Sequence, residues 1–365
     1  MREKLFCIGV LCGLALAGCS RSGDTPALAD SPATTKPSNT FCDSPNDQDL
    51  EKTARCFHSG VPRDAWLLLS KEAQAEEGNR EEFARGFGPE RQVPIAFRVL
   101  GVDTRNGQTL GRVEAVYSNS RKDKTCKNTV TFSWIQEGAE WRRIRLPRTK
   151  ELYDQQFANG DYSGAVSTAE KWLAKDPISP QAYKALVFAI WRGGRSSANT
   201  RSLPDTVRAA LAVNPSDSDG LFTAVTFTLD PDVAESLFDR FSVDDCLREG
   251  AAFNLAMKLP PKRALELLEK LGSSSASTQM QIIKLATRVG DKKRLEVALT
   301  EERDKQIRTE LDSEDGSFAA AWAVSMGEAW LALNKRDTAK AWASYAATRD
   351  PNHEEVARLL RRVKN

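Results

Sequence analysis

Few side chains in this sequence are suited to chemistry. Beyond residue 40 they are mainly four cysteines, Cys42, Cys56, Cys126 and Cys246, together with two histidines. In an oxidising compartment such thiols form disulfides, and four cysteines permit three complete pairings. We expect a bridge within Cys42, Cys56 and Cys126, because all three fall in one predicted domain. Cys246 lies on a predicted helix far along the chain and is expected to be a small buried apolar residue.

The histidines do not complete a recognisable catalytic arrangement. The run Cys56-Phe57-His58 offers a nucleophile and a base, but residues two apart at a helix end point to different faces. His353 follows Asp350-Pro351 in a predicted turn. There is no Cys-x-x-Cys pair, phosphate-binding loop or dinucleotide fingerprint. We therefore expect a protein without catalytic residues, metal or cofactor.

The N-terminus has the three parts of a bacterial export signal. Arg2 and Lys4 precede an apolar run over residues 5–17, which is too short to span a bilayer comfortably. The run ends in Leu16-Ala17-Gly18-Cys19, which resembles the lipobox of bacterial lipoproteins. That resemblance implies a signal peptide over 1–18, removed by the lipoprotein signal peptidase, and lipidation of Cys19 with acyl chains such as palmitate.

The resemblance also implies a location. By the sorting rule of Gram-negative lipoproteins, a serine after the lipidated cysteine favours the outer membrane, on its periplasmic side, and this chain has Ser20 there. Residues 19–40 continue in Ser, Thr, Pro, Ala and Gly, which predicts a flexible tether. The 52 basic and 50 acidic side chains nearly balance, so nothing favours a nucleic-acid partner.

Residues 41–147 predict an α+β domain. Apolar residues at helical spacing over 49–87 are followed by runs that alternate with a period of two, the mark of an antiparallel meander. The segments Asp64-Ala65-Trp66-Leu67-Leu68-Leu69-Ser70, Glu81-Glu82-Phe83 and Trp141-Arg142-Arg143-Ile144 resemble the nuclear transport factor 2-like superfamily. That resemblance implies a curved sheet wrapped around helices into a cone.

The alternation also predicts which strand side chains point into the cone. Phe97, Val113, Phe132 and Trp134 are the expected inward positions. Apolar side chains of this size either fill a core or line a small apolar pocket. Some enzymes of the superfamily place a carboxylate or histidine inside the cone, but we can map no such residue here.

Residues 148–365 predict helices throughout. Phe157-x-x-Gly160-Asp161-Tyr162-x-x-Ala165, which ends at Asp176-Pro177, resembles a tetratricopeptide repeat. Leu331-x-x-Asn334-Lys335-Arg336-x-x-Ala339, which ends at Asp350-Pro351, resembles a second copy. The two alanines lie 174 residues apart (339 − 165), close to five repeats of about 34. The expected fold is therefore an α+β domain followed by an all-α helical-repeat solenoid.

Two functions are compatible with this organisation. Solenoids present an extended concave face, so we expect a lipid-anchored scaffold or adaptor that binds another envelope protein or peptide. The alternative is that the cone binds a small apolar ligand or carries weak enzyme activity.

Overall fold

The computed structural model describes residues 49–58, 62–86, 93–105, 107–121, 124–193, 202–213, 215–272 and 275–364. The chain divides into two compact units, residues 1–248 and 249–365. The predicted signal peptide, the tether, Cys19 and Cys42 lie outside the described residues.

Within the described ranges, four short helices precede a four-stranded sheet: α2 (Leu50–His58), α3 (Pro62–Leu67), α4 (Lys71–Glu77) and α5 (Arg80–Gly86). The strands are β1 (Ala96–Arg105), β2 (Gln108–Arg121), β3 (Lys124–Glu137) and β4 (Glu140–Arg143). They pair antiparallel in chain order, which confirms the predicted meander. Gly138 permits the β3–β4 turn, because its φ of 67° is in the left-handed region that side chains disfavour.

Helices pack against both faces of the sheet, and the alternation along β2 decides which residues meet them. Val113 and Trp134 face α2–α5 and belong to a core with Phe57, Leu68 and other apolar side chains of those helices. Leu110 and Ile144 belong to a second core formed with the helices that follow the sheet. The sheet is therefore a layer between two sets of helices.

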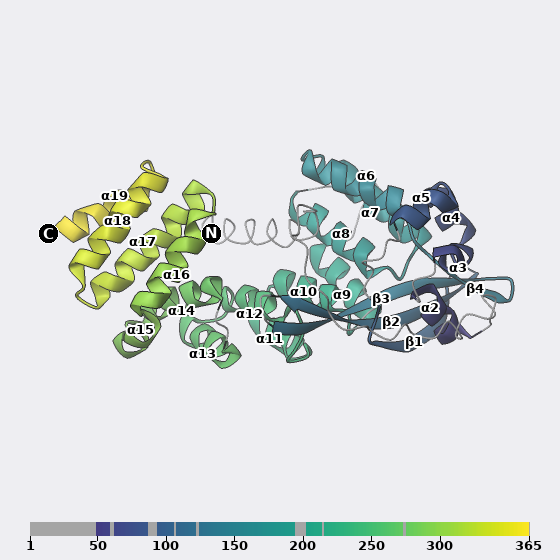
Figure 1. Cartoon of the computed structure of the whole chain (residues 1–365), viewed down its shortest axis with the longest axis horizontal. Coiled ribbons are helices and arrows are strands. Elements are labelled where there is room, and N and C mark those ends of the chain that lie inside the picture. Colours follow the sequence, from purple (N-terminus) through teal and green to yellow (C-terminus); the bar gives the residue numbers. More distant parts are fainter. Residues whose placement is uncertain are drawn as a thin grey trace, which may run out of the picture. The chain divides into compact units, whose positions relative to one another are not determined.

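Helices of the first unit continue beyond the sheet: α6 (Pro147–Ala158), α7 (Tyr162–Lys175), α8 (Pro180–Trp191), α9 (Leu203–Val213), α10 (Ser218–Phe227) and α11 (Pro231–Phe238). Consecutive members of this series pack against each other (Figure 1). The predicted boundary at 147/148 marks the change from strands to helices. It does not divide the core, because strand residues such as Leu110 pack among α6–α9.

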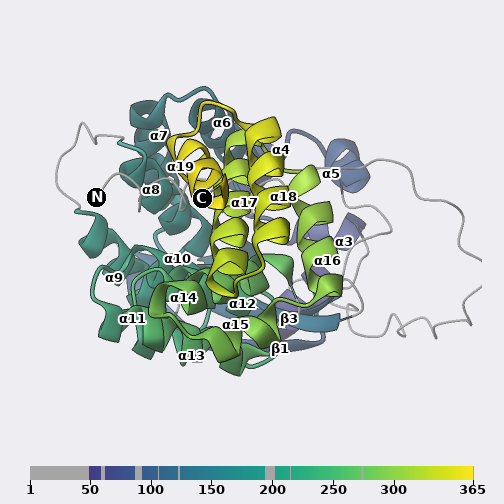
Figure 2. The same ribbon diagram turned by 90° about the vertical axis from the view of Figure 1, so that its left-hand side faces the viewer.

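Helices of the second unit are α12 (Arg248–Ala256), α13 (Pro261–Leu271), α14 (Ala276–Val289), α15 (Lys292–Ala298), α16 (Glu301–Asp312), α17 (Gly316–Ala332), α18 (Arg336–Arg349) and α19 (Glu354–Lys364). Figure 2 looks onto this unit, where α16, α17 and α18 run side by side.

The two predicted repeat signatures both fall at turns between paired helices. Gly160 (φ 76°) separates α6 from α7, and Asn334 (φ 60°) separates α17 from α18. Both residues are in the left-handed conformation that ends a helix, which glycine and asparagine tolerate best. Tandem helical hairpins are thus a feature of both units, as the sequence predicts.

One edge of the sheet is joined to the helices by hydrogen bonds. The Thr131 N–H donates to Asp217 Oδ2 (2.8 Å) and the Thr129 N–H donates to Ser218 Oγ (2.9 Å). Lys127 pairs with the segment before α12 as an isolated bridge: its N–H donates to the Asp244 carbonyl (2.7 Å). These groups satisfy outward backbone donors of β3 where β4 is too short to reach.

A disulfide closes the same edge. Cys126 of β3 is bonded to Cys246, with a Cα–Cα distance of 5.0 Å. Cys126 therefore takes no part in the bridge expected within Cys42, Cys56 and Cys126, and the prediction that Cys246 is a buried apolar residue is wrong. The cause is the packing of β3 against the α11–α12 connection, which no local pattern shows. Cys56 is buried in α2, and a bridge between it and Cys42 stays a prediction.

Two buried carboxyl groups lie where the helices meet β3. Burial raises the pKa of Asp217 from 3.8 to about 7, and the nearby Asp219 carboxylate adds to the rise. Burial also raises the pKa of Asp176 to about 6, although Ser133 and Arg143 favour its ionised form. Asp217 caps α10 as well, since its Oδ1 accepts from the Gly220 N–H (2.9 Å).

The raised pKa of Asp217 predicts a pH-dependent stability. The folded state holds this proton more tightly than the unfolded chain, so the contribution of Asp217 to stability is fully present below about pH 4 and is lost as the pH rises through 7. This contribution to the free energy of unfolding of the wild type should therefore fall between about pH 5 and 8. Asp217→Asn keeps an acceptor but cannot ionise, so its free energy of unfolding should lack this fall of about 2 kcal/mol. Urea unfolding at several pH values measures the free energy of unfolding of both proteins. Asp230→Asn, at the exposed N-cap of α11, is the control. Parallel pH profiles for wild type and Asp217→Asn would contradict the assignment.

Candidate functional site

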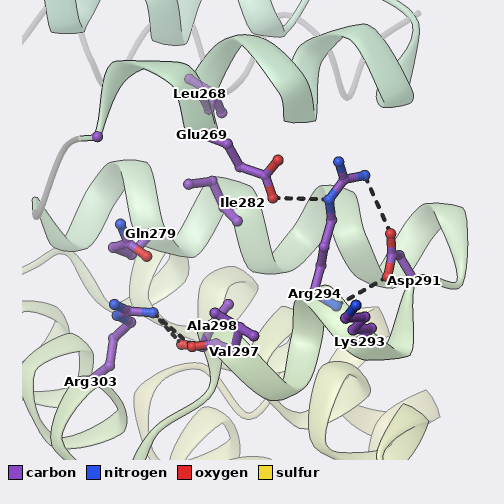
Figure 3. A pocket seen from close by; sticks show the side chains of 11 residues that line it. Leu268, Glu269, Gln279, Ile282, Asp291, Lys293, Arg294, Val297, Ala298 and Arg303 are labelled. Atoms are coloured by element: carbon purple, nitrogen blue, oxygen red, sulfur yellow. Dashed lines mark hydrogen bonds and ion pairs between the residues drawn. The ribbon is translucent and has the colours of Figure 1, made fainter.

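The candidate site is a groove of about 720 Å³ in the second unit, between α13, α14, α15 and the start of α16 (Figure 3). The side chains of eleven residues line it: Leu268, Glu269, Gly272, Gln279, Ile282, Asp291, Lys293, Arg294, Val297, Ala298 and Arg303. They come from four consecutive elements, so local packing alone determines the geometry of the groove.

The helix ends explain why the groove is open. Gly272 (φ 62°) ends α13 and Gly290 (φ 71°) ends α14, each in the left-handed conformation typical of a C-cap. The following helix α15 begins at the N-cap Asp291 and has 7 residues, against 14 in α14. A helix half as long cannot cover the whole length of α14. Part of the α14 surface therefore remains open to the groove.

Apolar side chains make up much of the lining. Leu268, Ile282 and Ala298 are buried, with exposed fractions of 0%, 7% and 4%. Val297 differs, because 71% of its surface is exposed although it lies beside these residues. An aliphatic side chain that is solvated next to a groove is available to contact a ligand.

Charged side chains occupy the rest of the lining. Arg294 Nε lies 3.1 Å from Glu269 Oε1, and its Nη1 lies 3.3 Å from Asp291 Oδ2, so both carboxylates of the groove face one guanidinium (Figure 3). Arg303 Nη1 donates to the carbonyl oxygens of Val297 (3.3 Å) and Ala298 (2.9 Å) at the end of α15. A cation there complements the helix dipole.

Counting these charges indicates what the groove can bind. Three cations, Lys293, Arg294 and Arg303, face two carboxylates, and Arg294 contacts both of those carboxylates. Lys293 is exposed, and the lining carries one positive charge in excess. The eleven lining residues include no serine, cysteine or histidine. The groove is thus equipped to bind an apolar group beside an anionic one, and its lining offers no hydroxyl, thiol or imidazole group.

The residues predicted to point into a cone occupy a packed core. Val113 and Trp134 are fully buried, and Phe97 and Phe132 are half-buried against the same core. His58 of α2 fills the space between the last two, with ring centroids 5.4 Å from Phe97 and 4.9 Å from Phe132. Of the two alternatives for these positions, the structure has the filled core.

Metal-binding groups and membrane-spanning helices can be assessed for the described residues. Those residues contain no group of three or more His, Cys, Asp or Glu side chains arranged to hold a metal ion. None of their helices is both long and apolar enough to cross a bilayer.

Sequence reasoning missed the groove. The pattern over 148–365 predicts helices in this region, but it does not single out Val297, Arg294 or Arg303. A signal was present: Asp291 and Thr300 are residue types that cap helix N-termini, and the helix that fits between them is too short for an ordinary repeat helix.

Several solved structures resemble part of this chain at low sequence identity. No family model matches the sequence, and no curated protein is significantly similar to it. The crystal structure of PilW, a "widely conserved type IV pilus biogenesis factor", is 15% identical at a TM-score of 0.46, over 59% of this chain and 97% of that one. The MamA protein is 16% identical at 0.29, over 56% and 91%. A thermophilic TPR protein of Thermus thermophilus is 18% identical at 0.28, over 60% and 98%.

Such low identities and TM-scores support no inference about partners or function. The helical repeats of this chain are established by its own tandem hairpins.

The lining predicts two opposite mutational outcomes. Leu268→Ala removes a fully buried side chain and should lower the free energy of unfolding by about 2–4 kcal/mol. Val297→Ala should change it by less than about 0.5 kcal/mol, because Val297 is mostly solvated. Urea unfolding of both variants measures this. A large loss for Val297→Ala would show that this valine is needed for folding, and would remove it from the candidate site.

Proposed function

We propose that this chain is a non-enzymatic adaptor, anchored by lipid on Cys19 to the periplasmic side of the outer membrane, that binds a segment of another envelope protein. The observation that carries the proposal is the groove: an apolar lining with the exposed Val297, bordered by the cation Lys293. Tandem helical hairpins commonly present such surfaces to protein segments.

The composition of the groove indicates the kind of segment. Val297 and the accessible part of Ile282 offer contact to one apolar side chain, whose burial would supply most of the binding free energy. Lys293 would favour a carboxylate next to them, adding orientation more than affinity. We infer a short segment with an apolar anchor and an acidic neighbour.

The membrane anchor rests on the sequence Leu16-Ala17-Gly18-Cys19 and the basic and apolar residues before it. Lipid on Cys19 and the tether of residues 19–40 would keep the groove close to envelope partners. The alternative function, ligand binding or weak enzyme activity in the cone, has no observation in its favour, because its candidate positions pack into a core.

Site-specific photo-crosslinking in intact cells tests the binding proposal. A photoreactive residue at position 297 should form an adduct with a protein, whereas the same residue at Val243, which is also highly exposed (83%) but lies outside the groove, should not. If the segment is acidic, Lys293→Glu should reduce the adduct at 297 severalfold. Equal adducts at 297 and 243, or none at either, would contradict the proposal.

The anchor predicts a change of fraction on mutation. The wild-type chain should sediment with membranes and incorporate labelled palmitate. Cys19→Ser should abolish the label and leave the chain unprocessed or soluble, because the acyl chains supply the membrane affinity. Cys42→Ser is the matched control and should keep the label. Labelled palmitate on Cys19→Ser would contradict the lipobox assignment.

A further inference from the structure

The two outer edges of the sheet differ in how far other segments of the chain cover them. At the far edge, β4 is covered by residues 68–70: the Ser70 N–H donates to the Arg143 carbonyl (3.0 Å), and Leu69 bridges Arg143. The rest of that edge is β3, covered by α10 and the α11–α12 connection. Among the described ranges, no residue forms a bridge to the outer side of β1. A ten-residue strand whose outer edge no described residue covers is a template for another strand.

The side chains along this open edge include exposed aliphatics. Ile95, Val99 and Val102 have exposed fractions of 58%, 37% and 51%. Edge strands of monomeric proteins ordinarily carry charges, and β1 has them at Arg98, Asp103 and Arg105. It also has exposed β-branched residues on both sides of its midpoint, which suit contact with a further strand.

A bulge decides which of these side chains share a face. Val99 pairs with Val113 and Gly101 with Arg112, so Leu100 is an extra residue in β1. Because of it, Val99 and Val102 lie on the same face, opposite Val113 and Gly111. Arg98 and Asp103 likewise share the other face, opposite Glu114 and Leu110. Without the bulge, neither pair could share a face.

We propose that β1 pairs antiparallel with β1 of a second copy of this chain, about a twofold axis that passes between Leu100 and Gly101. This register places Val99 opposite Val102 of the second copy, and Arg98 opposite its Asp103. Directly opposed side chains of antiparallel strands come into contact. Each contact occurs twice, as twofold symmetry requires.

The charges of the sheet favour this register. Arg98 Nη2 lies 3.0 Å from Glu114 Oε1, and Arg112 Nη2 lies 3.0 Å from Asp103 Oδ2. Pairing two copies therefore produces a row of alternating sign: Glu114, Arg98, Asp103 of the second copy, then its Arg112. The side chains of Arg98 (63% exposed) and Asp103 (37%) are both accessible for the contact.

The same features discriminate against other strands. A bulge and two opposite charges disfavour pairing with a flat apolar strand, which cannot match the interruption at Leu100. A second copy matches it by symmetry. The partner of this edge is therefore another copy of the chain, separate from the segment proposed for the groove.

Sedimentation velocity of the full chain in a density-matched detergent solution tests the proposal. The wild type should show a monomer–dimer equilibrium. Arg98→Glu and Asp103→Lys should each associate about tenfold more weakly, because like charges replace two ion pairs. An equimolar mixture of the two variants should recover association, since each variant then meets its complement. Arg208→Glu on α9, a similarly exposed arginine (75%), should behave as wild type.

The outcomes separate clearly. A wild type that stays monomeric across the concentration series overturns the proposal. So does a dimer that is unaffected by either substitution, or a mixture of folded variants that does not recover association. Circular dichroism checks that both variants fold. If they do not, Val102→Lys on the opposite face decides, because it should weaken the dimer without touching an ion pair.

Discussion

The outer edge of β3 must find hydrogen-bond partners, because β4 covers only its final residues and buried backbone donors are costly to leave unpaired. Those partners are Asp217 and Ser218 at the start of α10, with Asp244–Cys246 beyond them. The Cys126–Cys246 disulfide fixes the same contact covalently. The rest of the first unit follows, since α10 placed against β3 brings α6–α9 over the second face of the sheet.

This constraint divides the molecule by role. Residues at the β3–helix contact are hydrogen-bonded, and Thr131, Asp217 and Ser218 among them are buried, so they serve the fold. Two surfaces with exposed apolar side chains lie away from it: Val99 and Val102 on the outer edge of β1, and Val297 beside the groove of the second unit. The sheet therefore has one edge, along β3, that helices cover, and one edge, along β1, with exposed apolar side chains. The groove belongs to the second unit and does not depend on either edge.

Periodicity was sufficient for the elements and insufficient for their contacts. The period of two over 95–146 predicted the meander, and Gly160-Asp161 and Asn334 marked hairpin turns that the structure has. The Cys126–Cys246 pair was missed because it joins residues 120 positions apart through an edge contact that leaves no local pattern. The groove was missed because it results from the shortness of α15, a property of helix ends more than of composition.

Amide hydrogen exchange resolved to single residues tests the central claim most directly. Neighbouring N–H groups of a strand point to opposite sides, so the Val130 amide faces β2 while those of Thr129 and Thr131 face outward. If the helices close this edge, the Thr129 and Thr131 amides should exchange as slowly as that of Val130. Exchange of these two amides at the rate of an unpaired edge strand, with Val130 still protected, would contradict the account.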